Sequence, residues 1–388
     1  MEKKLVYLDN ASTTQMYPEA IEELQKVSRE IIGNPSSQHY YGRKAKILLE
    51  QAREIIASSI NAKPNEIYFT SGGTESLNFC IKGIAKALKK EFNSNIIISS
   101  KTEHSATTES LELLIKENFK VFYLNSSPIA KIVYPLEKYE FNSIYNCLAT
   151  LIHVNNETGA VLDEEIIKYL KSEGAFIHID AVQSFCKNEI DVSKLPIDAL
   201  SISSHKIHGP KGVGAVYLRN GTPIESLIVG GSQERQKRGG TENLAGIIAF
   251  AKAVQIAFKN LKNNFEYVSK LKKKFVEYIF QIDKEGIRIN SEENFSPYIL
   301  NITFLPEFYK CDVESALIFL DLKGVCASAS SACASGIFNF SKMLVKAGMT
   351  EKEAKQSIRF SFSIFNTFED IEIAALALEE LKKKFRVI

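Results

Sequence analysis

Short apolar segments alternate with amphipathic ones over the first half of the chain, and this alternation limits the folds open to it. Seven strand-like segments lie near residues 67–70, 96–99, 121–124, 149–153, 175–179, 198–202 and 213–218. Helical patterns near 75–90, 104–118 and 163–173 separate some of them. Such alternation is typical of a mostly parallel sheet with helices on both faces. We therefore expect an α/β domain whose ligands bind at the carboxyl ends of the strands.

The pattern changes from about residue 260. One helical stripe carries Leu261, Phe265, Val268, Leu271, Phe275 and Ile279, residues 298–304 alternate as a strand, and a final stripe carries Ile371, Ala374, Ala375, Leu378, Leu381 and Phe385. These elements predict a small α/β domain beside the first. We expect residues 15–260 to form the large domain, and residues 1–14 with 261–388 to form the small one.

Composition indicates a cytoplasmic protein. With 388 residues, 45% of them hydrophobic, the chain can bury one large and one smaller core. Lys and Arg number 48 against 46 Asp and Glu, so no basic face for nucleic acid is indicated. The amino terminus leads straight into a strand, without a long apolar segment that would suggest a signal peptide or membrane span. The six cysteines are scattered without zinc spacing, and a glycine and a proline follow His205 and His208, so we expect neither disulfides nor a metal.

Lys206 stands in the stretch with the clearest chemical meaning. Ser203-Ser204-His205-Lys206 precedes Ile-His-Gly-Pro. A Schiff base requires an amine held close to an aldehyde, while hydroxyl and backbone N–H groups can hold a phosphate. The stretch therefore suits a covalent site for pyridoxal phosphate, although a lysine in such surroundings is, taken alone, more often a solvated loop residue.

Asp180 supports the cofactor interpretation. It follows the apolar run 175–179, where a buried parallel strand would end. A pyridoxal ring needs an acid facing its ring nitrogen, because a protonated ring is a better electron sink. The alternative is an Asp that caps the next helix, which is common. Pairing with Lys206 favours the cofactor role.

Two further strand ends carry candidate ligands. Ser71-Gly72-Gly73-Thr74 joins a short strand to a helix and could bind a phosphate through Thr74 and the Gly73 N–H, although an ordinary helix cap explains it as well. His104 follows the strand at 96–99 and could stack on a flat cofactor, or be purely structural.

The order of the motifs reveals a resemblance to a known family. The motifs are Tyr7 to Thr14, Gly33 to Ser37, Thr70 to Ser76, Thr102-Glu103-His104, His153 to Gly159, Asp180 to Gln183, Ser203 to Lys206, Arg238-Gly239-Gly240-Thr241, Ser330 to Cys333 and Ser357 to Ser361. From about residue 5 onward, the chain resembles group I (NifS/IscS-type) cysteine desulfurases. These belong to the class V aminotransferase family of fold-type I pyridoxal phosphate enzymes. The resemblance implies a large, mostly parallel, seven-stranded domain and a small α/β domain.

The resemblance also implies a role for each motif residue. Lys206 would hold the cofactor and act as the base at the substrate Cα, Asp180 would face the ring nitrogen, and His104 would stack on the ring and transfer protons. The other implied cofactor ligands are Gly73, Thr74, Asn156, Gln183, Ser203 and His205, with Thr241 reaching the cofactor of the partner subunit in a homodimer. Arg359 would clamp the substrate carboxylate, and Asn156 would also contact the substrate.

Cys333 is the implied sulfur acceptor. It lies among small residues, and we expect a mobile loop over about 326–337. The implied reaction converts L-cysteine to L-alanine and leaves a persulfide on Cys333. The sulfur would then pass to a protein of iron–sulfur cluster assembly or of tRNA thiolation. A selenocysteine lyase, a class V aminotransferase and a non-catalytic scaffold remain alternatives.

Overall fold

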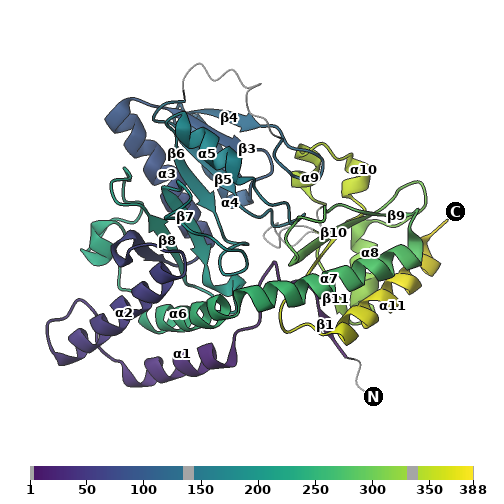
Figure 1. The fold of residues 1–388 in the computed structure, drawn as a ribbon, viewed down its shortest axis with the longest axis horizontal. Helices are drawn as coiled ribbons and strands as arrows, with labels where there is room; N and C mark the ends of the chain where they lie inside the picture. Colours follow the sequence, from purple (N-terminus) through teal and green to yellow (C-terminus); the bar gives the residue numbers. More distant parts are fainter. Residues whose placement is uncertain (1–3, 134–143, 330–339, 388) are drawn as a thin grey trace.

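A large mixed sheet forms the first half of the molecule (Figure 1). A computed structural model of the chain describes residues 4–133, 144–329 and 340–387. The sheet has the strand order β2-β8-β7-β6-β5-β3-β4. Its strands are β2 (Ile67–Thr70), β3 (Ile96–Ser100), β4 (Lys120–Leu124), β5 (Leu148–Ile152), β6 (Phe176–Asp180), β7 (Ala199–Ser203) and β8 (Gly214–Leu218). Only β8 runs antiparallel to its neighbours, β2 and β7, so the predicted mostly parallel, seven-stranded sheet is confirmed.

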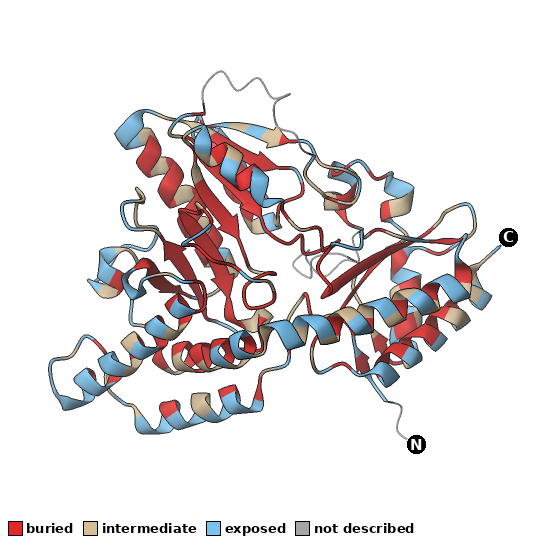
Figure 2. Cartoon of the chain, viewed as in Figure 1, coloured by how far each residue is buried: buried red, intermediate tan, exposed pale blue. Residues whose placement is uncertain are grey.

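Helices cover both faces of this sheet. The structure contains α1 (Pro18–Glu30), α2 (Tyr40–Ser58), α3 (Gly73–Phe92), α4 (Ser105–Lys116), α5 (Glu164–Ser172) and α6 (Leu244–Lys259), with short 3-10 turns η1 (Pro64–Glu66), η3 (Ser204–Lys206) and η4 (Gln233–Gln236). Alternate strand residues point to opposite faces. Ile177 and Ile179 share a core with α2, α5 and α6, whereas Ile97 and Leu148 pack with α3 and α4. All the strands except the edge strand β4 are therefore buried almost throughout (Figure 2).

The second half of the chain builds a smaller layer of its own. It contains α7 (Leu261–Asp283), β9 (Ile287–Ile289), β10 (Ile299–Phe304), α8 (Val313–Leu322), β11 (Val325–Cys326), α9 (Lys342–Lys346), α10 (Glu351–Ala354), β12 (Ser357–Ser361) and α11 (Phe368–Phe385). β12, β10 and β9 form an antiparallel sheet in that order. α7 and α11 lie side by side against it (Figure 1).

The N-terminal segment packs with this second half. β1 (Val6–Tyr7) pairs in parallel with β11, and Val6 and Leu8 are buried in the core that α7 and α11 form. These contacts support our assignment of residues 1–14 and 261–388 to one small domain and of 15–260 to the other, a division that we propose.

The predicted helical stripes differ from the structure in one respect. In α7, Val268, Leu271, Phe275 and Ile279 are buried as expected, but Phe265 is 37% exposed and lines a surface hollow.

Within the described residues, no single helix is long and apolar enough to cross a membrane. Helices α6 and α7 are long and apolar enough only when they are taken as a pair, and the pair is bent by 73°.

Candidate active site

The predicted site residues converge on one cavity of about 140 Å³ at the carboxyl ends of the central strands. The predicted residues among its lining are Gly73, Thr74, His104, Asn156, Asp180, Gln183, Ser203, His205, Lys206 and Arg359; Ala11, Ser12, Leu77, Ile152 and Val182 complete it. Two predicted residues are not among them. Thr241 is exposed, and Cys333 lies outside the described residues.

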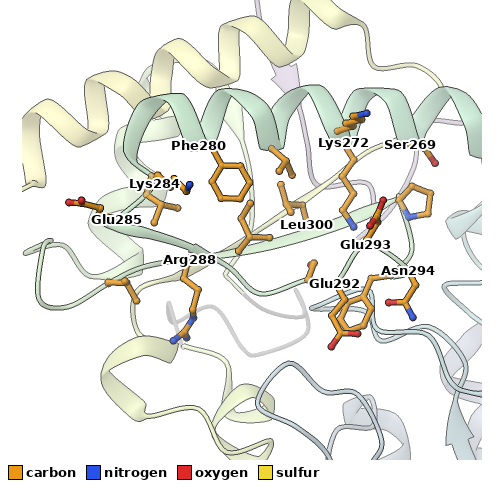
Figure 3. Close-up of a pocket in the computed structure, with 18 of the residues that line it drawn as sticks. Ser269, Lys272, Phe280, Lys284, Glu285, Arg288, Glu292, Glu293, Asn294 and Leu300 are labelled. Atoms are coloured by element: carbon orange, nitrogen blue, oxygen red, sulfur yellow. The ribbon is translucent and has the colours of Figure 1, made fainter.

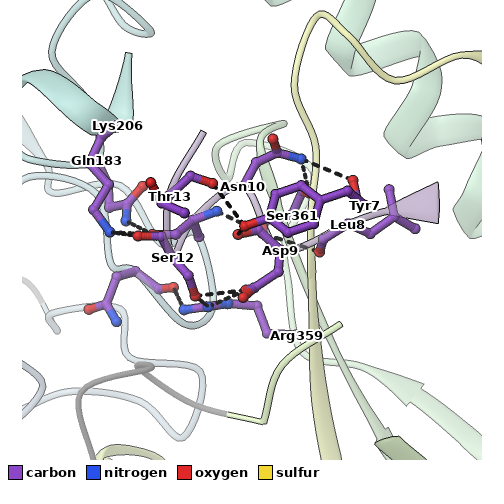
Figure 4. A network of polar contacts seen from close by, with 12 residues as sticks. Tyr7, Leu8, Asp9, Asn10, Ser12, Thr13, Gln183, Lys206, Arg359 and Ser361 are labelled. Atoms are coloured by element: carbon purple, nitrogen blue, oxygen red, sulfur yellow. Dashed lines mark hydrogen bonds and ion pairs between the residues drawn. The ribbon is translucent and has the colours of Figure 1, made fainter. Parts of the chain in front are cut away.

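Lys206 enters the cavity from η3, the turn that directly follows β7. Its Nζ donates hydrogen bonds to the carbonyl oxygens of Ala11, at 2.5 Å, and Ser12, at 2.7 Å. Both carbonyls belong to the N-terminal segment, which crosses beside the site (Figure 4). Lys206 is therefore an oriented amine in a lined cavity, and the alternative of a solvated loop lysine is wrong.

Asp180 is the last residue of β6 and is almost completely buried. Burial raises the pKa of its carboxyl to about 6, while the hydrogen bond from the Val182 N–H and the charge of Lys206 oppose the rise. A turn, not a helix, follows β6, so Asp180 caps no helix there. The arrangement offers one buried carboxyl group to a ligand and suits a cationic ring nitrogen.

The beginning of α3 forms a cradle for an anion. A Cβ added to Gly73 would lie 2.9 Å from Val182 Cγ2, so a side chain there would force the neighbouring segment away. The Ser203 hydroxyl is buried and has no hydrogen-bond partner among the residues that the structure describes. A helix N-terminus with an unpartnered hydroxyl beside it is the donor set that a phosphate needs.

His104 has a structural role that the sequence did not reveal. It is the N-cap of α4, and its Nδ1 accepts a hydrogen bond from the Ala106 N–H at 3.1 Å. Burial, with the charges of Lys206 and Arg359, lowers the pKa of His104 to about 4. The ring is therefore neutral near pH 7 and, because Nδ1 accepts, carries its hydrogen on Nε2.

Arg359 lies in β12 and is 1% exposed. One terminal nitrogen donates to the Asn156 carbonyl at 2.9 Å, and the other donates to Asp9 Oδ1 at 2.8 Å and to the Ser12 hydroxyl at 2.9 Å (Figure 4). Its Nε is buried without a partner within the described parts of the chain. The guanidinium is thus held in place, and its Nε–H remains available to a ligand.

The N-terminal segment is the functional element that the residue-by-residue reasoning missed. Asp9 and Ser12 orient Arg359, while the Ala11 and Ser12 carbonyls hold Lys206. Tyr7 in turn fixes the segment, because its hydroxyl donates to the carbonyls of Asp9 and Thr13. The motif from Tyr7 to Thr14 is the sequence signal for this segment, but it does not predict which of its residues contact Lys206 and Arg359.

The loop that carries Thr241 is fixed at two points. Arg238 forms an ion pair with Glu75, in the first turn of α3, at 2.9 Å. Deeper in the loop, both terminal nitrogens of Arg53 donate to the two Glu234 carboxylate oxygens, each at 2.8 Å, and both side chains are buried. Glu234, Arg235 and Gln236 have positive φ angles of 43°, 53° and 64°. Such backbone persists only where surrounding contacts hold it, and the buried pair supplies them.

We expect Arg53→Met to destabilise the protein by about 3–5 kcal/mol, since it leaves the Glu234 carboxylate buried without its partner. The loss would show as a lower midpoint in urea unfolding followed by circular dichroism. Lys86→Met, which removes a surface pair with Glu117, should leave the midpoint almost unchanged. An Arg53→Met midpoint equal to that of Lys86→Met would contradict the proposed anchor.

A much larger hollow, of about 1000 Å³, lies elsewhere, between α7 and the β9–β10 edge (Figure 3). Phe280 and Leu300 contribute to its apolar floor, and Lys284, Arg288 and Glu292 lie at its margins. None of the predicted site residues lines it. The larger hollow is therefore not the candidate active site, because the oriented lysine, the buried acid and the held arginine all meet in the smaller cavity.

Comparison with known proteins identifies the family of this arrangement. Residues 6–373 match the family described as "Aminotransferase class-V". The chain is 40% identical to the cysteine desulfurase IscS of Dictyoglomus turgidum, over 100% of this chain and 96% of that protein. The chain belongs to the cysteine desulfurase family. The resemblance inferred from the motifs is confirmed.

Other cysteine desulfurases and NifS-like structures agree. IscS of Methanosarcina thermophila is 36% identical over 99% of this chain and 94% of that protein. A solved structure titled "NIFS-LIKE PROTEIN" has a TM-score of 0.88 and 32% identity, covering 98% of this chain and all of the other. A structure titled "SspA in complex with cysteine" has a TM-score of 0.78 and 32% identity over 93% of this chain and 100% of the other. The predicted fold type is therefore confirmed, and the class V family to which these enzymes belong uses pyridoxal phosphate.

Proposed function

We propose that the protein converts L-cysteine to L-alanine with pyridoxal phosphate at Lys206 and collects the sulfur on Cys333 as a persulfide. The observation that carries the proposal is the single cavity in which Lys206, Asp180 and Arg359 meet. They come from η3, β6 and β12, the last of which belongs to the second half of the chain.

The cavity fits the proposed cofactor. The start of α3 and the unpartnered Ser203 hydroxyl suit its phosphate, with Thr74 and His205 beside them, and Asp180 suits its ring nitrogen. His104 lines the same cavity and can stack on the ring. When bound, pyridoxal phosphate supplies an electron sink for the charge left after a proton is removed from the substrate Cα.

Substrate binding follows from the fixed arginine. We assign the L-cysteine carboxylate to Arg359, because its Nε is buried without a described partner and charge-assisted hydrogen bonds to carboxylates are strong. Asn156 lies at the same end of the cavity and also lines it. The Lys206 amine would act as the base at Cα, and the Nε2–H of His104 can donate a proton inside the cavity.

Sulfur transfer is assigned to Cys333. Its thiolate attacks the substrate sulfur, the substrate carbon–sulfur bond breaks, and one proton delivered to Cβ and one returned to Cα complete alanine. Ser328 pairs with Arg359 through two backbone hydrogen bonds, of 2.7 and 3.1 Å, and Ala329 is the last described residue before Cys333. The segment that leads to Cys333 thus starts beside Arg359.

The other cysteines are poor candidates for this role. Cys80, Cys147 and Cys311 are buried, and burial raises the pKa of each thiol to about 12. Burial also raises the pKa of Cys186, which is buried, and of Cys326, which is only half-buried. A raised pKa suppresses the thiolate that sulfur capture needs.

The proposal also includes a homodimer and the proteins that accept the sulfur. Thr241 is exposed, away from its own cavity, and follows Gly240 at the end of the anchored loop; this suits a residue that completes the partner's site in a homodimer. The persulfide would pass to an iron–sulfur scaffold or a tRNA-thiolation protein. A cytoplasmic location suits the five described cysteines, which are all free thiols.

The assay that tests this function follows alanine and sulfide from L-cysteine in the presence of dithiothreitol. We expect equal amounts of both products. Arg359→Lys should lower kcat/KM about 10- to 100-fold, mainly by raising KM, because a lysine ammonium replaces a planar guanidinium that hydrogen bonds hold in place. Arg288→Lys, at an exposed pair with Glu353, should leave both constants unchanged. A 2-oxo acid product instead of alanine would favour an aminotransferase, and an unchanged KM in Arg359→Lys would remove the carboxylate assignment.

A further inference from the structure

Lys187 is a buried lysine that the proposed mechanism does not use. It lies in the turn after β6 and is 6% exposed. Its Nζ stands 5.3 Å from the centre of the Tyr298 ring and forms none of the ion pairs found among the described residues. Burying a lysine without a carboxylate is costly. The cost of burying Lys187 therefore suggests that this lysine has a function.

The charged and titratable groups that face Lys187 are mostly basic. They are Lys206 and His205 on η3, His208 just after it, Arg359 on β12, and the ring of Tyr298 before β10. Burial lowers the pKa of Lys187 to about 7, and the charges of Lys206 and Arg359 add to the effect. The amine is thus partly neutral near pH 7, but it can donate a hydrogen bond in either protonation state.

The hydrogen-bond partner of Lys187 is Gln183. Lys187 Nζ donates to Gln183 Oε1 at 3.4 Å, and Gln183 Nε2 donates to the Ala11 carbonyl at 2.8 Å. The Ala11 carbonyl oxygen can only accept, and it also accepts a hydrogen bond from Lys206 Nζ. Both ends of the amide are therefore fixed in one orientation. Gln183 lines the cavity, so the second hydrogen on Nε2 is a donor at the cofactor site.

We propose that Lys187 is a positioning residue that holds the Gln183 amide with its nitrogen toward the cofactor site. Lys187 does not line the cavity and so acts through Gln183. Held in this way, Gln183 stabilises a negatively charged oxygen of the bound cofactor. It thereby lowers the pKa of the proton that the cofactor shares with Lys206. This inference rests on the proposed pyridoxal phosphate site.

The test is a pH titration of the visible absorption band of the protein loaded with pyridoxal phosphate. Lys187→Met should raise the midpoint by about one pH unit, which corresponds to the loss of one hydrogen bond. The variant should fold, because methionine has a similar length and removes an uncompensated buried amine. Lys187→Gln, which keeps a donor, should stay closer to the parental midpoint.

Combining variants shows whether Lys187 acts through Gln183. Gln183→Ala should raise the midpoint by a similar amount, and adding Lys187→Met to it should change little further. Lys272→Met is the matched control. Lys272 is another mostly buried lysine, with its pKa lowered to about 8 by burial, but its Nζ donates to the Ser296 carbonyl and it does not line the cavity. Its loss should leave the midpoint unchanged.

Three outcomes would overturn the inference. These are a parental midpoint in Lys187→Met, equal shifts in Lys187→Met and Lys187→Gln, and fully additive shifts in the double variant, which would mean that the charge of Lys187 acts directly. If the unmodified protein forms no visible band at all, the proposed cofactor site fails instead, so the two failures can be told apart.

Discussion

Cys333→Ser should abolish the release of alanine from L-cysteine while leaving the visible spectrum of the loaded protein intact. A serine hydroxyl stays protonated at neutral pH, so it cannot attack the substrate sulfur as a thiolate does. We expect a loss of at least ~10³-fold in kcat, since the covalent sulfur acceptor is removed. Mixing with L-cysteine should still change the absorption band, because cofactor and substrate contacts lie in the cavity with Lys206 and Arg359.

Cys326→Ser provides the matched control for this prediction. Cys326 is the one described cysteine that is not fully buried, and it precedes Cys333 by seven residues. Burial and two nearby acids, Asp321 and Asp9, raise the pKa of its thiol. The variant should therefore keep most of the activity. Alanine release at the parental rate by Cys333→Ser would remove Cys333 from the mechanism.

Lys206→Ala should eliminate the covalent attachment of the cofactor and the turnover together. Without the amine there is no Schiff base to reduce, and the proposed base at Cα is lost as well. Borohydride treatment of the loaded parental protein, followed by peptide mass analysis, should place the reduced adduct on Lys206, and the variant should yield none. Alanine formation should fall by ~10⁴-fold or more.

Lys211→Ala separates this effect from a general loss of positive charge near the loop. Lys211 is exposed and lies five residues beyond Lys206. Its replacement should leave the adduct and the rate unchanged. An adduct on any lysine other than Lys206 would show that the covalent site has been misassigned.

The sequence was sufficient for those parts of the fold that depend on local pattern. The inner strands of the large sheet coincide with apolar runs, because a strand buried on both faces has little tolerance for polar residues. Asp180 and Lys206 could be brought together from sequence because parallel β6 and β7 end at the same edge of the sheet. The beginning of α3 followed from its Gly-Gly-Thr turn in the same way.

Contacts between distant segments could not be predicted. The pairing of Arg359 with Asp9 joins residues 350 positions apart, and no periodicity encodes it. The buried pair of Arg53 with Glu234 holds a loop whose left-handed residues are not glycines, so local propensity argued against that loop. Three helices, α1, α2 and α6, were also not predicted from the sequence. For α6 the reason is that most of its surface is apolar, so its helical periodicity is weak.

His104 shows how two roles can share one residue. Its place after β3 suggested a ring near a cofactor, and the structure puts it in the cavity. The same ring caps α4, which fixes its tautomer, while burial and the charges of Lys206 and Arg359 lower its pKa and keep it neutral. Histidine is an uncommon N-cap, so no sequence rule would have revealed this second role.

In the proposed reaction, sulfur from L-cysteine arrives on Cys333. The most direct measurement is mass spectrometry of the loaded protein after brief incubation with L-cysteine without reductant, with peptides resolved for all six cysteines. We expect a gain of one sulfur atom on the peptide that contains Cys333, reversed by dithiothreitol and absent from Lys206→Ala. Added sulfur on Cys326 or a buried cysteine with Cys333 unmodified, or alanine formed with no cysteine modified, would contradict it.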